Sequence, residues 1–150
     1  MGDVNHVALD YELAEDPEHR DLMTWTDLGL GERVSRYFKT PKNTEDLLNR
    51  REMIERSTRL GGSVVLLVKE IGTDALFALD LVSRVVDAKI DTNYNARVKA
   101  FHNFCKKEDL TLAVAQTDVK GDRSLLPSEQ EHPAYYVHLV EDREDGIVVR

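Results

Sequence analysis

The sequence predicts an α+β fold in which helices come first and strands follow. Apolar residues recur every three or four positions as far as about residue 107, which is the period of a helix buried on one side. From residue 110 onward they tend to alternate with other residues, which is the period of a strand. The chain has 150 residues, of which 41% are hydrophobic, and this is enough apolar material for one core.

The charge and the cysteine content exclude several classes of protein. The formal net charge of -8 argues against a general nucleic-acid-binding protein, because neutralising phosphates requires clustered lysine and arginine. The single cysteine, Cys105, excludes an internal disulfide and an all-cysteine metal cluster within one chain. The first residues lack the basic and apolar segments of a signal peptide. We therefore expect a soluble, cytoplasmic protein.

Residues 1–40 carry many charges and little periodicity, so we expect a loose N-terminal arm. One helical turn is expected after Pro17. The aromatic residues Trp25, Tyr37 and Phe38 are expected to attach the arm to the rest of the chain.

Residues 41–108 are predicted to form part of a helical domain. Asn43, followed three residues later by Asp46, is typical of a helix start, and it predicts a helix over 44–59 that ends at Gly61-Gly62. A third helix is expected over 93–107.

The helix between these two, over about 64–86, has the clearest pattern in the chain, and we expect it to be mostly buried. Its apolar stripe consists of Val64, Val68, Ile71, Ala75, Leu79, Val82 and Val86. Its narrow polar face consists of Lys69, Thr73, Asp80, Arg84 and Asp87. Charged residues interrupt the apolar run, and their cost in a bilayer excludes a membrane span.

Residues 109–150 are predicted to begin a β domain. Strands are expected over 110–116, 134–140 and 146–150, with a hairpin loop over 141–145. Three strands make a thin sheet with open edges, which native proteins usually cover. We therefore expect a partner chain, an oligomer contact or a deleted C-terminal portion.

The segment "AQTDVKGDRS" (115–124) follows the first of these strands and contains residues suited to an anionic ligand. Lysine, arginine, hydroxyl groups and a glycine are able to hold a phosphate, but a solvated charged turn has the same composition. The segment matches neither a Walker loop nor a Rossmann fingerprint. The five histidines include no H-E-x-x-H pair, so no metal site is predicted.

Several segments together resemble one family. "GERVSRYFKTPKNTEDLLNRREMIE", "DLTLAVAQTDVKGDRSLLPSEQ" and "EDGIVVR" resemble the 4-hydroxyphenylacetate 3-hydroxylase / 4-hydroxybutyryl-CoA dehydratase (vinylacetyl-CoA delta-isomerase) family, and the resemblance covers about residues 10–150. It implies an acyl-CoA dehydrogenase-like fold with N-terminal helices, a middle β-barrel and a C-terminal helical bundle, assembled as an oligomer. This chain would hold part of the helices and the first strands of the barrel.

The resemblance also implies a flavin cofactor, FAD, bound along residues 114–124. Carried over position by position, Val114, Ala115, Gln116 and Thr117 approach the isoalloxazine ring. Lys120, Asp122 and Arg123 approach the ribityl-diphosphate part.

The catalytic residues of the family do not transfer to this chain. The arginine and tyrosine that hydroxylases use for a phenolic substrate are absent from Ile71–Ala75, and Val114 stands where they carry a histidine. The dehydratases take two cysteines of a [4Fe-4S] cluster from positions matching about Leu66 and Glu70, neither of which is a thiolate. Catalytic residues therefore stay unknown. Asp74 and Lys69 are the only ionisable groups on this helix that we expect to be able to approach a substrate.

Three functions remain open, of which the third is a standalone small-molecule-binding α+β domain unrelated to the family. The first is part of an FAD-dependent oxidoreductase or lyase, either a monooxygenase or a dehydratase/isomerase, that acts on an aromatic or CoA-thioester substrate. In this function the chain works together with the C-terminal half of the family polypeptide, which is a separate chain or part of a homo-oligomer. The second is a non-catalytic assembly or binding subunit, or a degenerate fragment that keeps the fold without a complete site.

Overall fold

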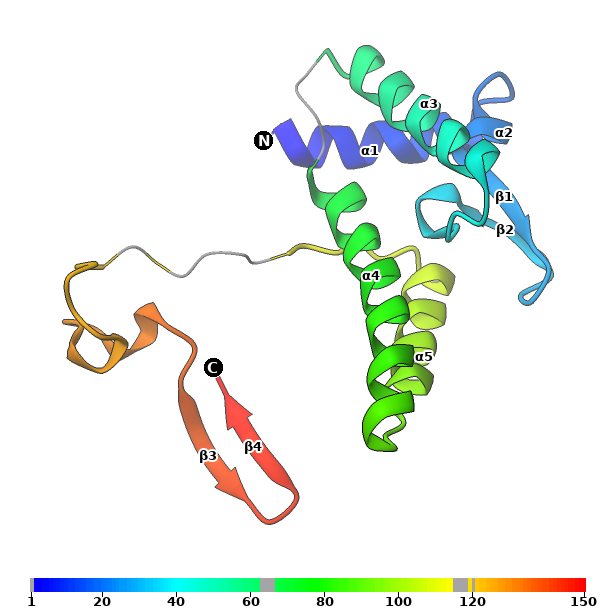
Figure 1. Ribbon diagram of the computed structural model, residues 1–150. Coiled ribbons are helices and arrows are strands. Elements are labelled where there is room, and N and C mark those ends of the chain that lie inside the picture. Colours follow the sequence, from blue (N-terminus) through cyan, green and yellow to red (C-terminus); the bar gives the residue numbers. More distant parts are fainter. Residues whose placement is uncertain (1, 63–66, 115–118, 120) are drawn as a thin grey trace. The chain divides into compact units, whose positions relative to one another are not determined.

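The computed structural model describes residues 2–62, 67–114, 119 and 121–150. The chain divides into two compact units, residues 1–114 and 115–150. Among the described residues, the first unit contains the α-helices and one β-hairpin, and the second contains a β-hairpin preceded by short 3-10 turns (Figure 1). The predicted α+β order is confirmed.

The first forty residues are more structured than we predicted. They form α1 (Gly2–Glu15), α2 (Arg20–Met23), the antiparallel strands β1 (Thr24–Asp27) and β2 (Glu32–Ser35), and the 3-10 turn η1 (Arg36–Phe38). The expected helical turn after Pro17 is α2, but the expectation of a loose arm is wrong. The arm folds because Leu13, Met23 and Tyr37 are buried in one core with Met53 from the next helix. Such long-range burial leaves no periodic signal in the local sequence.

Helix α3 (Thr44–Leu60) begins and ends where the sequence predicts. The side-chain oxygen of Asn43 accepts a hydrogen bond from the Asp46 amide at 2.9 Å, which satisfies one of the free donors at the helix start. After the helix, Gly62 has a φ of 60°, a left-handed conformation that glycine adopts without steric cost.

Helices α4 (Leu67–Ile90) and α5 (Tyr94–Lys107) lie side by side (Figure 1). The carboxylate of Asp87 joins them, because it accepts hydrogen bonds from the amides of Tyr94 and Asn95 at the start of α5, both at 2.8 Å. The chain after α5 then passes very close to α4. A Cβ atom on Gly72 would lie 2.1 Å from the backbone oxygen of Leu112, so only glycine fits there.

The two faces of α4 are used in the opposite way from our prediction. Most of the apolar stripe that the structure describes is exposed, whereas much of the polar face is buried. Exposed apolar side chains of α4 include Ile71, Leu79, Val82 and Val85. Buried polar side chains of α4 are Lys69, Glu70, Thr73, Asp80 and Ser83. Among the described helices, none is long and apolar enough to cross a membrane.

Several buried polar groups of α4 are tolerated because they find hydrogen-bond partners. The side-chain amide of Asn95 on α5 donates to the carboxylate of Asp80 at 2.9 Å and to the hydroxyl of Ser83 at 3.0 Å. The Thr73 hydroxyl donates to the backbone oxygen of Lys69 at 2.8 Å. Since a buried polar group costs little once it is hydrogen-bonded, α4 packs Asp80 and Ser83 on α5 while Leu79 and Val82 stay exposed.

The second unit contains fewer strand residues than predicted. Its elements are the 3-10 turns η2 (Pro127–Glu129) and η3 (Pro133–Tyr135) and the antiparallel strands β3 (Leu139–Arg143) and β4 (Gly146–Val149). Strand β4 confirms the predicted last strand. The predicted strand over 134–140 is wrong in position, since η3 occupies its start and β3 begins only at Leu139.

The predicted strand over 110–116 is also wrong where the structure describes it. Residues 110–114 form no strand, and 115–116 lie outside the described residues. The alternating pattern is present in this segment, but among the described residues no strand pairs with it. Without a neighbouring strand the segment lacks the inter-strand hydrogen bonds that stabilise a sheet.

Candidate functional site

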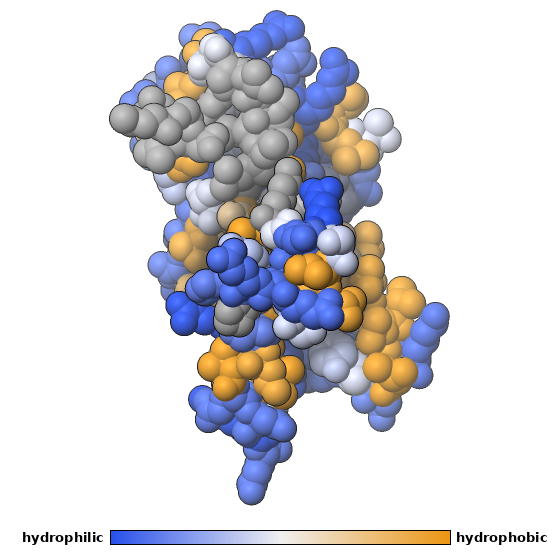
Figure 2. All heavy atoms as spheres, turned by 90° about the vertical axis from the view of Figure 1, so that its left-hand side faces the viewer, coloured by the Kyte–Doolittle hydropathy of each residue, from blue (hydrophilic) through white to orange (hydrophobic). Residues whose placement is uncertain are grey.

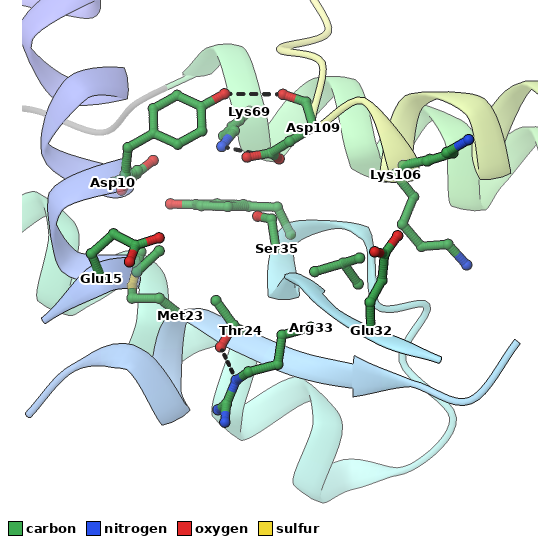
Figure 3. Close-up of a pocket in the computed structure, with 15 residues that line it drawn as sticks. Asp10, Glu15, Met23, Thr24, Glu32, Arg33, Ser35, Lys69, Lys106 and Asp109 are labelled. Carbon is green, nitrogen blue, oxygen red and sulfur yellow. Dashed lines mark hydrogen bonds and ion pairs between the residues drawn. The ribbon is translucent and has the colours of Figure 1, made fainter. Parts of the chain in front are cut away.

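A cavity of about 340 Å³ lies in the first unit between α1, the β1–β2 hairpin, the start of α4 and the end of α5 (Figure 3). Charges of both signs line it. The acids are Asp10, Glu15, Glu32 and Asp109, and the bases are Arg33, Lys69, Lys106 and Lys107.

Lys69 is held inside the protein at the wall of this cavity. Its ammonium lies 3.5 Å from the carboxylate of Asp109 and over the rings of Tyr11 and Tyr37, at 4.6 Å and 5.4 Å from their centroids. The Tyr11 hydroxyl donates to the backbone oxygen of Asp109 at 3.1 Å, and burial together with the Asp109 charge raises the pKa of Tyr11. Lys69 therefore ties α4 to α1 and to the end of α5, as a structural residue.

Two other cations of the cavity are likewise engaged. Lys106 lies 2.7 Å from the carboxylate of Asp27, and this contact lowers the pKa of Asp27. Arg33 is hydrogen-bonded to Thr24 at 2.9 Å and paired with Asp21. Because these charges are balanced by neighbouring residues, the cavity is poorly suited to a strongly anionic ligand.

Among the described residues, Arg50 of α3 makes side-chain hydrogen bonds to four different residues. Its guanidinium donates to the backbone oxygens of Tyr37 and Glu70, at 3.0 Å and 3.2 Å. It also donates to the hydroxyl of Thr73 at 2.9 Å and to the carboxylate of Asp74 at 2.8 Å. Asp74, which we considered as a group able to approach a substrate, is thus paired with an arginine of its own chain.

Glu70 is a buried acid. From the sequence it stands out only because it occupies a position where the dehydratases carry a cysteine ligand of their [4Fe-4S] cluster. Both of its carboxylate oxygens are buried without a hydrogen-bond partner among the described residues. Burial, together with the negative charge of Asp10, raises the pKa of Glu70 to about 7 despite the opposing effects of a backbone hydrogen bond and of Arg50. Its burial arises from packing against other helices, so no local sequence signal identifies it.

The residues predicted to bind flavin fall where the first unit ends and the second begins along the chain. Val114 is half exposed at the end of the first unit. Ala115, Gln116, Thr117 and Lys120 lie outside the described residues, so those four assignments stay predictions. Asp122 and Arg123 belong to the second unit, and both are exposed.

The loop around Arg123 places an exposed cation beside an ionised acid that is hydrogen-bonded to its own loop. The carboxylate of Asp122 accepts hydrogen bonds from the amide and the hydroxyl of Ser124, at 2.9 Å and 2.6 Å, and these lower the pKa of Asp122. Arg123 makes no hydrogen bond or ion pair with any other residue that the structure describes. An exposed guanidinium is able to bind a diphosphate, and the assignment of Asp122 and Arg123 to the cofactor stays a prediction.

Comparison with known proteins identifies the family. The model of the 4-hydroxyphenylacetate 3-hydroxylase N-terminal region matches residues 2–150. The chain belongs to this hydroxylase family. Its α+β fold is accordingly that of the N-terminal region of these acyl-CoA dehydrogenase-like proteins, and among the described residues there is no closed barrel.

Two curated relatives represent two branches of the hydroxylase family. The 4-hydroxybutyryl-CoA dehydratase/vinylacetyl-CoA-Delta-isomerase of Clostridium aminobutyricum is 36% identical over 98% of this chain. The oxygenase component of 4-hydroxyphenylacetate 3-monooxygenase from Thermus thermophilus is 28% identical over 99% of it. This chain spans only 30% of the length of either relative.

Solved structures of the hydroxylase family show the same fold over nearly the whole chain. An oxygen-tolerant 4-hydroxybutyryl-CoA dehydratase from N. maritimus superposes with a TM-score of 0.78 at 30% identity, covering 98% of this chain and 29% of that one. The oxygenase component of 4-hydroxyphenylacetate 3-monooxygenase, in complex with FAD and 4-hydroxyphenylacetate, superposes with a TM-score of 0.68 at 25% identity. It covers 99% of this chain and 30% of that one.

No metal site is found among the residues that the structure describes, where no three histidine, cysteine or acidic side chains converge. Of the two positions that match the cluster cysteines of the dehydratases, Glu70 is buried, and Leu66 lies outside the described residues. The only cysteine of the chain, Cys105, is buried in the second core, and burial raises the pKa of its thiol. Neither the thiol nor Glu70 is suited to an iron–sulfur cluster of the dehydratase kind.

Proposed function

We propose that this chain is the N-terminal part of an FAD-dependent enzyme of the hydroxylase family, an oxidoreductase or lyase that acts on an aromatic or CoA-thioester substrate. Val114, Ala115, Gln116 and Thr117 would lie along the flavin ring. The ribityl-diphosphate part would be held by Lys120, Asp122 and Arg123. The flavin supplies electron-transfer chemistry when bound, and the protein orients it. A cytoplasmic location belongs to the same proposal.

The observation that carries the flavin assignment is the exposed Arg123. Its guanidinium has no partner among the described residues, and the neighbouring acid Asp122 is occupied by Ser124. A dinucleotide diphosphate would supply the missing partner, and charge-assisted hydrogen bonds from a guanidinium to phosphate are among the stronger contacts in proteins.

Replacing Arg123 with alanine tests this assignment. Losing one charge-assisted contact is expected to weaken FAD binding by roughly tenfold or more. The measurement is a titration with FAD in which flavin fluorescence reports binding. The sample is the full chain in the assembly in which it is isolated from its own cells. Arg143→Ala is the control, because Arg143 is an exposed arginine of the same unit that pairs with Glu141. Equal FAD affinity for unmodified protein and Arg123→Ala would remove the diphosphate assignment.

We also propose that the apolar stripe of α4 docks the C-terminal part of the family polypeptide, as a separate chain or within a homo-oligomer. The apolar residues of the stripe recur with the spacing of a buried helix face, yet the side chains of Ile71, Leu79 and Val82 are 41%, 52% and 57% exposed. In Figure 2 apolar residues form several patches between hydrophilic ones on the surface. Apolar surface of this extent usually marks an interface.

Replacing Val82 with lysine tests the docking surface. Since Val82 is exposed here, the change is expected to alter the free energy of unfolding of this chain by no more than about 0.5 kcal/mol. Association with the C-terminal polypeptide is expected to be lost, because docking would bury an unpaired charge. The measurement is co-purification with the tagged C-terminal polypeptide. The control is Leu28→Lys in the β1–β2 turn, an apolar residue that is 94% exposed and lies outside the stripe. Unimpaired co-purification of Val82→Lys would contradict the docking surface.

A second candidate function is a non-catalytic assembly subunit, and one observation favours it. Asp74 and Lys69, the two groups of α4 that we considered for contact with a substrate, are paired internally with Arg50 and Asp109. The visible spectrum of the isolated assembly separates the two functions. A flavin spectrum supports the enzyme, whereas a colourless assembly that fails to take up added FAD supports the assembly subunit.

A further inference from the structure

The side chain of Gln130 binds the loop that carries Arg123 at several points. Its amide oxygen accepts a hydrogen bond from the backbone amide of Asp122 at 3.0 Å. Its amide nitrogen donates to the backbone oxygen of the same residue at 2.7 Å and to that of Leu125 at 3.3 Å. Gln130 therefore satisfies both backbone groups of the residue directly before Arg123, as a neighbouring strand would in a sheet.

The residue before Asp122 leaves room for this side chain. A Cβ atom on Gly121 would lie 2.1 Å from the amide oxygen of Gln130 and 3.0 Å from the ring of Tyr135. No other residue type fits at position 121 while the Gln130 amide stays in place. Gly121 and Gln130 are nine residues apart in sequence, so this close fit is a property of the folded loop.

The loop bonds internally on the other side of Arg123 as well. The Asp122 carboxylate accepts from the amide and the hydroxyl of Ser124, and the Leu125 amide donates to the backbone oxygen of Asp122 at 3.2 Å. The backbone of Arg123 is thus fixed from both sides while its guanidinium stays exposed and without a partner among the described residues. The backbone that carries the cation is therefore ordered before a ligand binds, while the guanidinium stays free to contact it.

We propose that Gln130 is a positioning residue for the cofactor, which fixes the backbone of Asp122 and thereby presents Arg123 to the diphosphate of the dinucleotide. This rests on the proposed function, because it takes the diphosphate as the ligand of Arg123. Gln130 itself does not touch the cofactor in this proposal. It lowers the entropy lost on binding, since the loop no longer has to be ordered by the ligand.

The test uses the full chain in the assembly in which it is isolated, with FAD as the probe. Gln130→Leu keeps a side chain of similar size but removes every hydrogen bond to the loop, so FAD affinity is expected to fall by about tenfold. Gly121→Ala is expected to act in the same way by displacing the Gln130 amide. The control is Glu131→Gln, a change at the exposed neighbouring residue, and it is expected to leave FAD affinity unchanged.

Two further readouts distinguish positioning from a merely structural role. Backbone amide exchange at Asp122, measured without FAD, is expected to speed up in Gln130→Leu and Gly121→Ala while exchange in the β3–β4 hairpin stays as in the unmodified protein. In a double-mutant cycle, Arg123→Ala is expected to cost less FAD affinity in the Gln130→Leu background than on its own, because the guanidinium is already misplaced there.

The outcomes separate this inference from the proposed function. If Arg123→Ala weakens FAD binding but Gln130→Leu does not, the positioning role of Gln130 is wrong and the diphosphate assignment stands. The positioning role is equally wrong if the effects of the two substitutions on FAD affinity are additive. If Arg123→Ala has no effect, or the assembly binds no FAD, both the proposed function and this inference fail together.

Discussion

Replacing Arg50 with alanine is expected to lower the free energy of unfolding by about 3–5 kcal/mol, because the change removes four hydrogen bonds of one buried guanidinium. The guanidinium of Arg50 bonds to the backbone oxygens of Tyr37 and Glu70, to the Thr73 hydroxyl and to the Asp74 carboxylate. It also lies over the ring of Phe77, at 5.4 Å from its centroid. These contacts join η1 and α3 to α4, so their loss weakens the first unit as a whole.

The neighbouring Arg51 provides a matched control for this prediction. Its side chain is 76% exposed, and its contact with Glu55 is a surface ion pair at 3.7 Å, so Arg51→Ala is expected to change stability by no more than about 0.5 kcal/mol. Arg50→Lys is expected to recover little of the loss, since one ammonium group does not match the forked geometry of the acceptors. Urea unfolding followed by far-UV circular dichroism measures all three variants. A cost for Arg50→Ala as small as that for Arg51→Ala would show that the network contributes little.

Replacing Glu70 with glutamine is expected to stabilise the chain at pH 8 and to have little effect near pH 4.5. Burial raises the pKa of Glu70 from its ordinary 4.5 to about 7 in the folded chain. Between these two values the folded state keeps the proton that the unfolded state has released, so the free energy of unfolding falls as pH rises through this window. Above about pH 7 both states are ionised and the loss is complete, at roughly 2–3 kcal/mol.

Glu70→Gln removes this particular pH dependence, since glutamine carries no ionisable group and has nearly the same shape. Its stability advantage over the unmodified chain is expected to grow from about pH 4.5 to pH 7 and then to stay constant. Glu108→Gln, at an exposed carboxyl group after α5, controls for the change in net charge. Urea unfolding at a series of pH values measures the difference. An advantage of Glu70→Gln that does not change between pH 4.5 and pH 8 would show that Glu70 does not hold a proton in the folded chain.

Much of the helical part was predictable from the sequence because its signals are local. Asn43 and Gly62 mark the ends of α3, and the apolar period of 64–86 identifies α4 as a helix. In each case the physical cause lies within a few residues, so reading the chain in order is enough.

The structured N-terminus and the true buried face of α4 were not predictable in this way. The core around Tyr37 joins residues from α1, α2 and α3 that lie far apart in the sequence. The exposure of Leu79 and Val82 depends on which surfaces this chain itself supplies, and the sequence pattern only states that the stripe suits burial. The boundaries that we placed after residues 40 and 108 stay predictions.

The sequence by itself determined the α+β order, the positions of α3, α4 and α5, the last strand, and the resemblance that led to the family. It also determined that Arg123 lies beside Gly121 and Asp122, because neighbours in sequence are neighbours in space. Only the tertiary structure decided that Glu70 is a buried acid with a raised pKa, that Arg50 joins η1 and α3 to α4, and that Gln130 binds the backbone of Asp122. The physical reason is that burial and hydrogen bonding between distant residues depend on how elements pack, and packing leaves no mark on the local pattern of side chains.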